Sequence, residues 1–186
     1  MGVSWRSYYR PSMESVIRQR PPPPPPELCG GARVHREYDL GDLRGAKIYH
    51  VAVRNWEEEP GKGKPRELVI CAVRNGKYYE LSIYAYWVWF DDTGAYELDH
   101  YVETADCGAC PLEWTPVGGR LESLRGATIA RVVHYEEASE ADVYFMRDGS
   151  CYDLHVVMND IEEAAYLEFE VGEADPDDCR GPVQLL

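Results

Sequence analysis

The sequence predicts a mainly β protein made of two tandem four-stranded antiparallel meanders, related by a pseudo-twofold and packed as a sandwich or a closed barrel. Three observations lead to this prediction: a motif that occurs twice, a hairpin signal inside each copy, and alternating apolar and polar residues beside the hairpins. A four-stranded meander with one apolar face cannot bury that face alone. Two copies that cover each other solve this problem.

The repeated motif has two blocks with similar spacing in both copies. The blocks read Leu-Arg-Gly-Ala-x-Ile and Arg-[Asn/Asp]-Gly-x-x-Tyr-[Glu/Asp]-Leu-x-[Ile/Val]. The first block begins at Leu43 and again at Leu124, and the second block begins at Arg74 and again at Arg147. Because both blocks recur in the same order, chance is a poor explanation, and an internal duplication is the better interpretation.

Each copy contains a strong hairpin signal, Asn75-Gly76 in the first and Asp148-Gly149 in the second. Both central positions of such a turn need positive φ, which Asn, Asp and Gly tolerate best. Around the first turn we expect strands over residues 46–55, 68–74, 77–90 and 96–103. Around the second we expect strands over residues 128–135, 142–147, 150–158 and 166–171. Alternation predicts the apolar face of the strands after the turns; its residues are Tyr79, Leu81, Ile83, Ala85, Trp87 and Trp89, and Tyr152, Leu154, Val156 and Met158.

The predicted organisation has five segments. Residues 1–26 form a basic aromatic arm with a polyproline spacer, residues 27–104 the first repeat, and residues 105–120 an inter-repeat loop. Residues 121–173 form the second repeat, and residues 174–186 an acidic C-terminal tail.

The arm is the predicted partner-binding segment. Its first 20 residues hold four arginines against a single acidic residue, Glu14. Pro21 to Pro26 form a rod of roughly 19 Å at ~3.1 Å per residue in polyproline II geometry. The arm is either a disordered tail or a segment that orders when it docks on another protein or on copies of this chain. The residues predicted to make that contact are Trp5, Arg6, Tyr8, Tyr9 and Arg10.

Two further aromatic residues, Tyr84 and Tyr86, point away from the apolar face of the strand over residues 77–90. They predict an exposed aromatic surface, and such surfaces mark partner contacts. The alternative is that a loop or the N-terminal arm covers them.

The formal net charge of −14 argues against a chain that coats nucleic acid by neutralising phosphates. It favours solubility and basic partners. The N-terminus lacks the apolar segment of a signal peptide, and no apolar run is long enough to span a bilayer. A cytoplasmic or intracellular location is therefore expected, and a virion would also fit. Scarce Asn and Gln together with abundant Arg fit a thermophilic source, although GC-rich coding would give the same arginine bias.

Cysteines provide the candidate metal site. Cys71 and Cys151 fall inside predicted strands, where buried cysteine is common. The other four, Cys29, Cys107, Cys110 and Cys179, lie before, between and after the repeats. Cys107-x-x-Cys110 has the spacing of a zinc knuckle, and four thiolates would complete a structural zinc site. Disulfides, a redox-active pair and free thiols are the alternatives.

No catalytic or phosphate-binding motif is present in the sequence. The five histidines lack the spacing of a helical metal site, and runs of acidic residues are interpreted as turns and solvated edges. We therefore expect a non-enzymatic protein-binding or assembly protein, such as a subunit of a viral or large intracellular particle, that docks through its arm. The alternatives are an acidic inhibitor or nucleic-acid mimic, and an enzyme with a cleft between the repeats. Structural zinc is the one cofactor expected.

Overall fold

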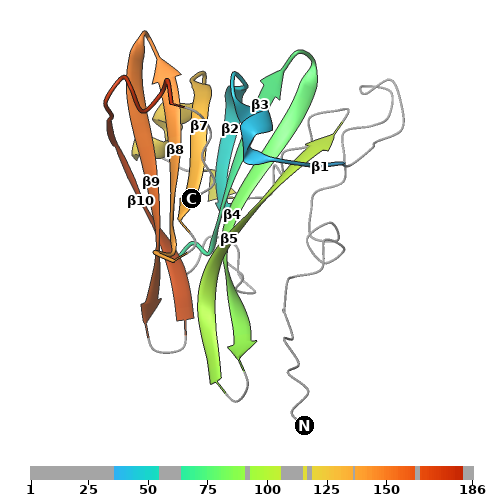
Figure 1. Cartoon of the computed structure of the whole chain (residues 1–186), viewed down its shortest axis with the longest axis vertical. Coiled ribbons are helices and arrows are strands. Elements are labelled where there is room, and N and C mark those ends of the chain that lie inside the picture. Colours follow the sequence, from blue (N-terminus) through green and yellow to red (C-terminus); the bar gives the residue numbers. More distant parts are fainter. Residues whose placement is uncertain are drawn as a thin grey trace.

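The computed structural model describes residues 36–54, 64–90, 93–105, 115–116, 119–135, 137–161 and 164–181 (Figure 1). The predicted arm of residues 1–26 lies outside these ranges, as does most of the inter-repeat loop. The described part is mainly β, as predicted from the sequence.

Eight strands of eight or more residues make up most of the structure. They are β2 (Lys47–Arg54), β3 (Glu67–Arg74), β4 (Lys77–Phe90), β5 (Thr93–Ala105), β7 (Thr128–Tyr135), β8 (Glu140–Arg147), β9 (Ser150–Ile161) and β10 (Ala164–Glu173). Two short strands, β1 (Arg36–Tyr38) and β6 (Thr115–Pro116), and two 3₁₀ helices, η1 (Leu40–Leu43) and η2 (Gly119–Leu124), complete the described elements.

All the strands belong to one antiparallel sheet with the order β1-β5-β4-β3-β2-β7-β8-β9-β10, and β6 pairs with β2 beside this path. The sheet is not closed, so the closed-barrel alternative is wrong. Figure 1 shows β7–β10 facing β2–β5 across the molecule, as in a sandwich. The two halves nevertheless belong to a single sheet, because β2 and β7 are neighbours within it.

One apolar core lies between the two halves. Its fully buried members come from both, for example Ile70 and Leu81 from β3 and β4, and Leu154 and Leu167 from β9 and β10. The bend of the sheet also brings β10 back to the chain in front of β3, where the Leu167 amide donates a hydrogen bond of 2.6 Å to the Pro65 carbonyl. Each half therefore covers the apolar face of the other.

Four backbone hydrogen bonds join the halves at the centre of the sheet. The amides of Gly45 and Ile48 donate to the carbonyls of Ile129 and Ala127, each at 2.8 Å. The amides of Gly126 and Ile129 donate to the carbonyls of Ile48 and Ala46, also at 2.8 Å. Gly45 and Gly126 adopt φ of +82° and +85°, a conformation that other residues rarely adopt, and each turns the chain from its 3₁₀ helix into its strand.

The predicted hairpins are confirmed. Asn75 and Gly76 have φ of 51° and 75°, and Asp148 and Gly149 have φ of 52° and 83°. These positive values match the turn that suits the right-handed twist of paired strands. Each half also has a register shift between its first two long strands. In the β2–β3 pair the shift lies between Ile48 and His50, and in the β7–β8 pair it lies between Ile129 and Arg131.

Strands β4 and β7 have the predicted bounds, and β2 is one residue shorter at each end. Strands β3, β5, β8, β9 and β10 are longer than predicted. In β5, β9 and β10 most of the extra residues lie at the ends that meet in the β4–β5 and β9–β10 hairpins, and the others lie at the opposite ends of β5 and β10. In both places, pairing with the neighbouring strand holds polar residues in the ladder. The 3₁₀ helices and the short strands β1 and β6 were not predicted, because two to six residues are too few to show a hydrophobic period.

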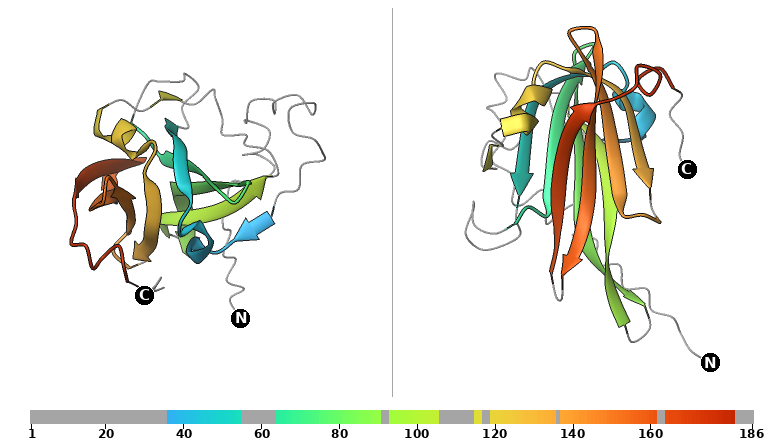
Figure 2. Two further views of the ribbon diagram at one scale, coloured as in Figure 1. Left: turned by 90° about the horizontal axis from the view of Figure 1, so that it is seen from above. Right: turned by 90° about the vertical axis from the view of Figure 1, so that its left-hand side faces the viewer.

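The β4–β5 hairpin is the longest feature of the fold and extends past the rest of the sheet (Figure 2). Strand β3 pairs with β4 only as far as Tyr84, whereas the β4–β5 ladder continues to the pair of Phe90 and Thr93. Among the described residues, no helix is both long and apolar enough to cross a membrane.

Candidate metal-binding cluster

A cluster of polar side chains lies on the outer face of β8 and β9. Asp142 is paired with His155 in the register of these strands, and Tyr144 is paired with Asp153. Side chains alternate along a strand, so all four lie on one face, whereas Val143 and Leu154 point to the core from the other. The Asp148-Gly149 hairpin fixes this register and thereby brings the cluster together.

Asp142 is at the centre of the cluster. Its Oδ1 is 2.6 Å from Nδ1 of His155, and its Oδ2 accepts a hydrogen bond of 3.3 Å from the Tyr144 hydroxyl. The Asp142 side chain is only 10% exposed, and that of His155 is 34% exposed. The Oδ1 atom of Asp153 is buried and has no hydrogen-bond partner. The cluster thus has one satisfied carboxylate, one imidazole and one buried carboxylate oxygen that lacks a donor.

The electrostatic environment of the cluster is strongly negative. Burial, reinforced by the charge of Asp142, raises the pKa of Asp153 to about 6. Burial alone would lower the pKa of His155, but the hydrogen bond to Asp142 and the charges of Asp142 and Glu140 raise it. Burial, followed by the charge of Asp142, also raises the pKa of Tyr144. Each of these shifts has the direction that a surplus of negative charge produces.

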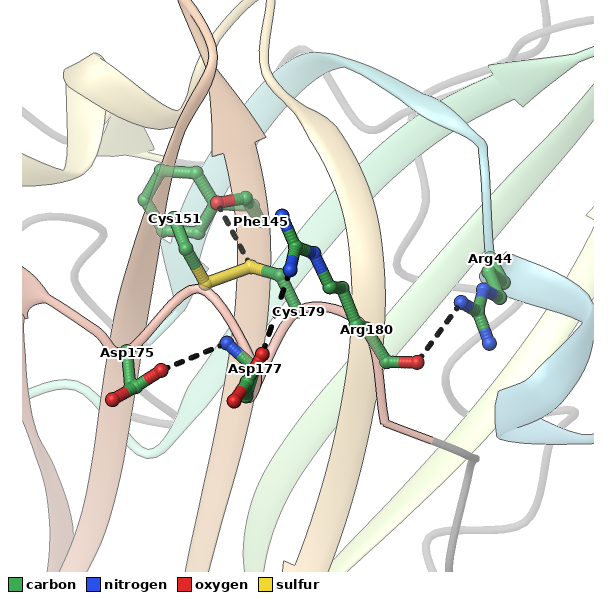
Figure 3. Close-up of a disulfide and its surroundings, with 7 residues drawn as sticks. All are labelled: Arg44, Phe145, Cys151, Asp175, Asp177, Cys179 and Arg180. Carbon is green, nitrogen blue, oxygen red and sulfur yellow. Dashed lines mark hydrogen bonds and ion pairs between the residues drawn. A yellow bond between two sulfur atoms is a disulfide. The ribbon is translucent and has the colours of Figure 1, made fainter.

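The C-terminal segment crosses this outer face and is held there by a disulfide between Cys151 and Cys179 (Figure 3). Cys179 is buried beside Ala130 and Cys151. Beyond it, the Arg44 guanidinium donates to the carbonyls of Arg180 and Gly181 at 3.5 and 3.3 Å. The described residues of the predicted acidic tail therefore pack against both halves of the sheet.

In the part of the chain that the structure describes, two groups of side chains could hold a metal ion. In the first, Asp142, Asp153 and His155 place one ligand atom each within 4.8 Å of one another, and Asp99, His100 and His134 do the same in the second. Two carboxylates and an imidazole form a set of oxygen and nitrogen ligands that suits divalent transition metals.

The second group lies on the inner face, where His100 of β5 and His134 of β7 meet. Their Nδ1 atoms are 2.9 Å apart, so one ring donates a hydrogen bond to the other. Asp99 Oδ1 accepts a hydrogen bond of 2.7 Å from the His100 amide and is 4.0 Å from its Nδ1. This group has one carboxylate instead of two, and the Oδ1 atom of that carboxylate already accepts a hydrogen bond from the His100 amide, so this group is the weaker candidate.

The predicted four-thiolate zinc site needs correction at Cys179. Its sulfur is bonded to Cys151, so it is not a thiolate ligand in this structure. The reason is the bend of the C-terminal segment across β9, which brings Cys179 to a cysteine that the sequence placed inside a strand. Cys71 is also in a disulfide. Cys29, Cys107 and Cys110 lie outside the described residues.

Disulfides persist in oxidising compartments and in intracellular proteins of hyperthermophiles. The intracellular or virion location expected from the sequence therefore stays a prediction.

The predicted partner-binding residues have different outcomes. Trp5, Arg6, Tyr8, Tyr9 and Arg10 lie outside the described residues. Tyr84 is only 3% exposed, so the expectation that it lies on an exposed aromatic surface is wrong. Tyr86 is half-buried, and its hydroxyl donates a hydrogen bond of 2.8 Å to Glu97. Of the two, only Tyr86 keeps part of its ring accessible.

Sequence reasoning missed the Asp142–Asp153–His155 cluster, because it considered only runs of adjacent acidic residues and helical histidine spacing. The signal that could have found it is the hairpin itself. Counting outward from Asp148-Gly149 pairs Arg147 with Ser150, and five steps later it pairs Asp142 with His155.

Comparison with known proteins gives no relative: no family model, no curated protein and no solved structure matches this chain.

Proposed function

We propose that this is a non-enzymatic protein-binding or assembly protein, in which the β sheet is a scaffold for the N-terminal arm and for the β4–β5 hairpin. The observation that carries the proposal is the length of this hairpin. Beyond the pair of Glu67 and Tyr84, β3 no longer accompanies β4, and the two strands continue as a ribbon. A projecting ribbon can reach a partner surface that the body of the sheet does not contact.

Aromatic packing supports the projecting part of the hairpin. Trp87 and Tyr96 are cross-strand partners, and their rings make an edge-on contact with centroids 4.7 Å apart. The indole of Trp87 also lies over Gly94, where an added Cβ would be 1.9 Å from the ring. Isolated two-stranded hairpins are marginally stable in water, and an aromatic pair of this kind contributes about 0.5–1.5 kcal/mol. The ribbon is thus held in shape before it meets a partner, which lowers the cost of binding.

Tyr86 is the side chain on this ribbon best suited to a contact. Burial, with help from the hydrogen bond to Glu97, raises the pKa of Tyr86, so the phenol stays protonated. A tyrosine with an apolar ring and a polar hydroxyl is typical of the cores of protein interfaces.

We further infer that the scaffold arose by duplication and has a pseudo-twofold. The support is that the central hydrogen bonds come in equivalent pairs. The bond from the Gly45 amide to the Ile129 carbonyl is matched by the bond from the Gly126 amide to the Ile48 carbonyl. The bond from the Ile48 amide to the Ala127 carbonyl is likewise matched by the bond from the Ile129 amide to the Ala46 carbonyl. These pairs lie in the two copies of the first repeated block. In an assembly, such a body offers similar surfaces on two sides.

Charge favours a contact between copies of the chain. The first 20 residues of the arm are basic, whereas the chain as a whole has a net charge of −14. The arm of one copy therefore has attractive electrostatics toward the body of another, and this attraction weakens with salt. A subunit of a viral or large intracellular particle would use its arm in this way, and another protein with an acidic surface would also suit the arm.

Sedimentation velocity tests this proposal on three proteins: the full chain, a chain without residues 1–26, and Tyr86→Ala. We expect the full chain to associate at low salt and both variants to associate less. The truncated chain should keep its melting temperature, because the proline rod separates the arm from the body. Tyr78→Ala is the matched control, because Tyr78 lies at the opposite end of the same strand, packed against Tyr49.

Affinity capture from the source of the protein extends the same comparison to other partners. If the full chain remains monomeric and also retains no protein that both variants lose, the proposal is wrong. Failure of the truncated chain to fold would place the arm within the core and contradict the boundary at residue 26.

A further inference from the structure

We propose that Asp142, Asp153 and His155 form a binding site for one divalent transition-metal ion, with Zn²⁺ the best match, and with water completing its coordination. Nothing in the proposed binding function requires this site. It is carried by three observations: the ligand geometry, a buried carboxylate oxygen without a donor, and a local surplus of acidic groups.

The geometry requires only small movements. The three ligand atoms already lie within 4.8 Å of one another on adjacent strands. Around Zn²⁺, with bonds of about 2.0–2.2 Å to nitrogen and carboxylate oxygen, ligand atoms lie roughly 3.3 Å apart. Nδ1 of His155 and Oδ1 of Asp142 are now 2.6 Å apart, so they must separate slightly. The His155 ring is a third exposed and has room to do so.

The buried Oδ1 atom of Asp153 indicates that a binding partner is missing. Oδ1 of Asp153 is buried without any hydrogen-bond donor, and burial of a polar atom in this state costs free energy. A cation bound between Asp142 and Asp153 would satisfy this oxygen and relieve the repulsion between the two carboxylates. The Tyr144 hydroxyl on Oδ2 of Asp142 would then orient the ligand from outside, as hydrogen-bonded groups around metal ligands commonly do.

The negative charge around the site favours the binding of a divalent cation. Glu140, Glu170 and Asp178 all act on Asp153 or His155, in addition to the two aspartates of the site. Arg131 lies over the Tyr144 ring and its charge acts on Tyr135, so it offsets only part of the charge of these carboxylates. Asp178 is held near the cluster by the neighbouring disulfide of Cys179. The imidazole ligand selects a transition metal over Ca²⁺ or Mg²⁺, which prefer oxygen ligands.

Calorimetric titration of the oxidised full chain with ZnCl₂ tests the proposal. Free thiols are first blocked with iodoacetamide without reductant, so that cysteine cannot bind the metal. The wild type is expected to bind one Zn²⁺ per chain and to gain melting temperature. Asp153→Asn keeps the shape of its side chain, and His155→Gln keeps a neutral polar side chain of similar length; each should weaken binding by at least about tenfold. The matched control His100→Gln changes the other histidine group and should bind Zn²⁺ like the wild type.

Several outcomes would overturn the assignment. They are absence of saturable Zn²⁺ binding to the wild type, unchanged binding by both site variants, and loss of binding in His100→Gln. Tighter binding of Ca²⁺ than of Zn²⁺ would contradict the choice of metal. Circular dichroism of each metal-free variant shows whether it is folded. If a site variant is unfolded, NMR of the wild type replaces it as the test. The ring signals of His155 are then expected to shift on addition of Zn²⁺, and unchanged signals would contradict the proposal.

Discussion

Replacing Leu154 with alanine is expected to lower the free energy of unfolding by about 2–5 kcal/mol, the range for removal of a buried leucine side chain. Leu154 lies in β9, is 0% exposed, and belongs to the core that both halves of the sheet share. Its loss leaves a cavity that neither half can fill alone, because the opposite wall of the cavity is fixed by the strand ladder.

Urea unfolding followed by circular dichroism measures this effect. Ser150→Ala is the matched control, since Ser150 is an exposed residue of the same strand and its replacement should change stability by less than about 0.5 kcal/mol. A cost below ~0.5 kcal/mol for Leu154→Ala would show that the side chain is not in a packed core.

Removing the disulfide in the double variant Cys151→Ala, Cys179→Ala is expected to cost about 3–4 kcal/mol. The two cysteines are 28 residues apart, and closing a loop of this size in the unfolded chain accounts for that amount in the chain-entropy account. The double variant is preferable to a reductant, because a reductant would also break the disulfide of Cys71.

The measurement is again urea unfolding, under oxidising conditions, together with peptide mapping of the wild type without reductant. Mapping should return a cross-linked peptide that contains Cys151 and Cys179. A stability loss below ~1 kcal/mol would indicate that the C-terminal segment is not constrained by this bond, and a peptide that links Cys179 to another cysteine would contradict the structure directly.

Local sequence signals predicted most of the strands. Asn75-Gly76 and Asp148-Gly149 fixed two turns, and alternation around them placed Leu81 and Leu154 correctly in the core. Such signals succeed because turn chemistry and side-chain alternation act over a few residues. The same reasoning failed for Tyr84, because a position on the outer face of a strand does not show whether the face is covered.

Contacts between distant segments could not be predicted in this way. The pairing of β2 with β7 rests on four backbone hydrogen bonds, which have no side-chain signature beyond the two glycines. Cys179 meets Cys151 only because the chain after β10 turns back across β9. The candidate metal cluster is an intermediate case. Its residues are far apart in the sequence, but the register of the second hairpin, read residue by residue, would have paired Asp142 with His155.

One sheet, continuous through β2 and β7, unites the two halves into a single scaffold. Native-state hydrogen exchange of the amides of Gly45, Ile48, Gly126 and Ile129 tests it most directly, because these amides donate the four bonds that join the halves. All four amides are expected to exchange only through global unfolding, with the same opening free energy as the core amides of β3 and β8. If they exchange through a smaller opening while both halves keep their protection, the halves are separate units and the sheet is not one scaffold.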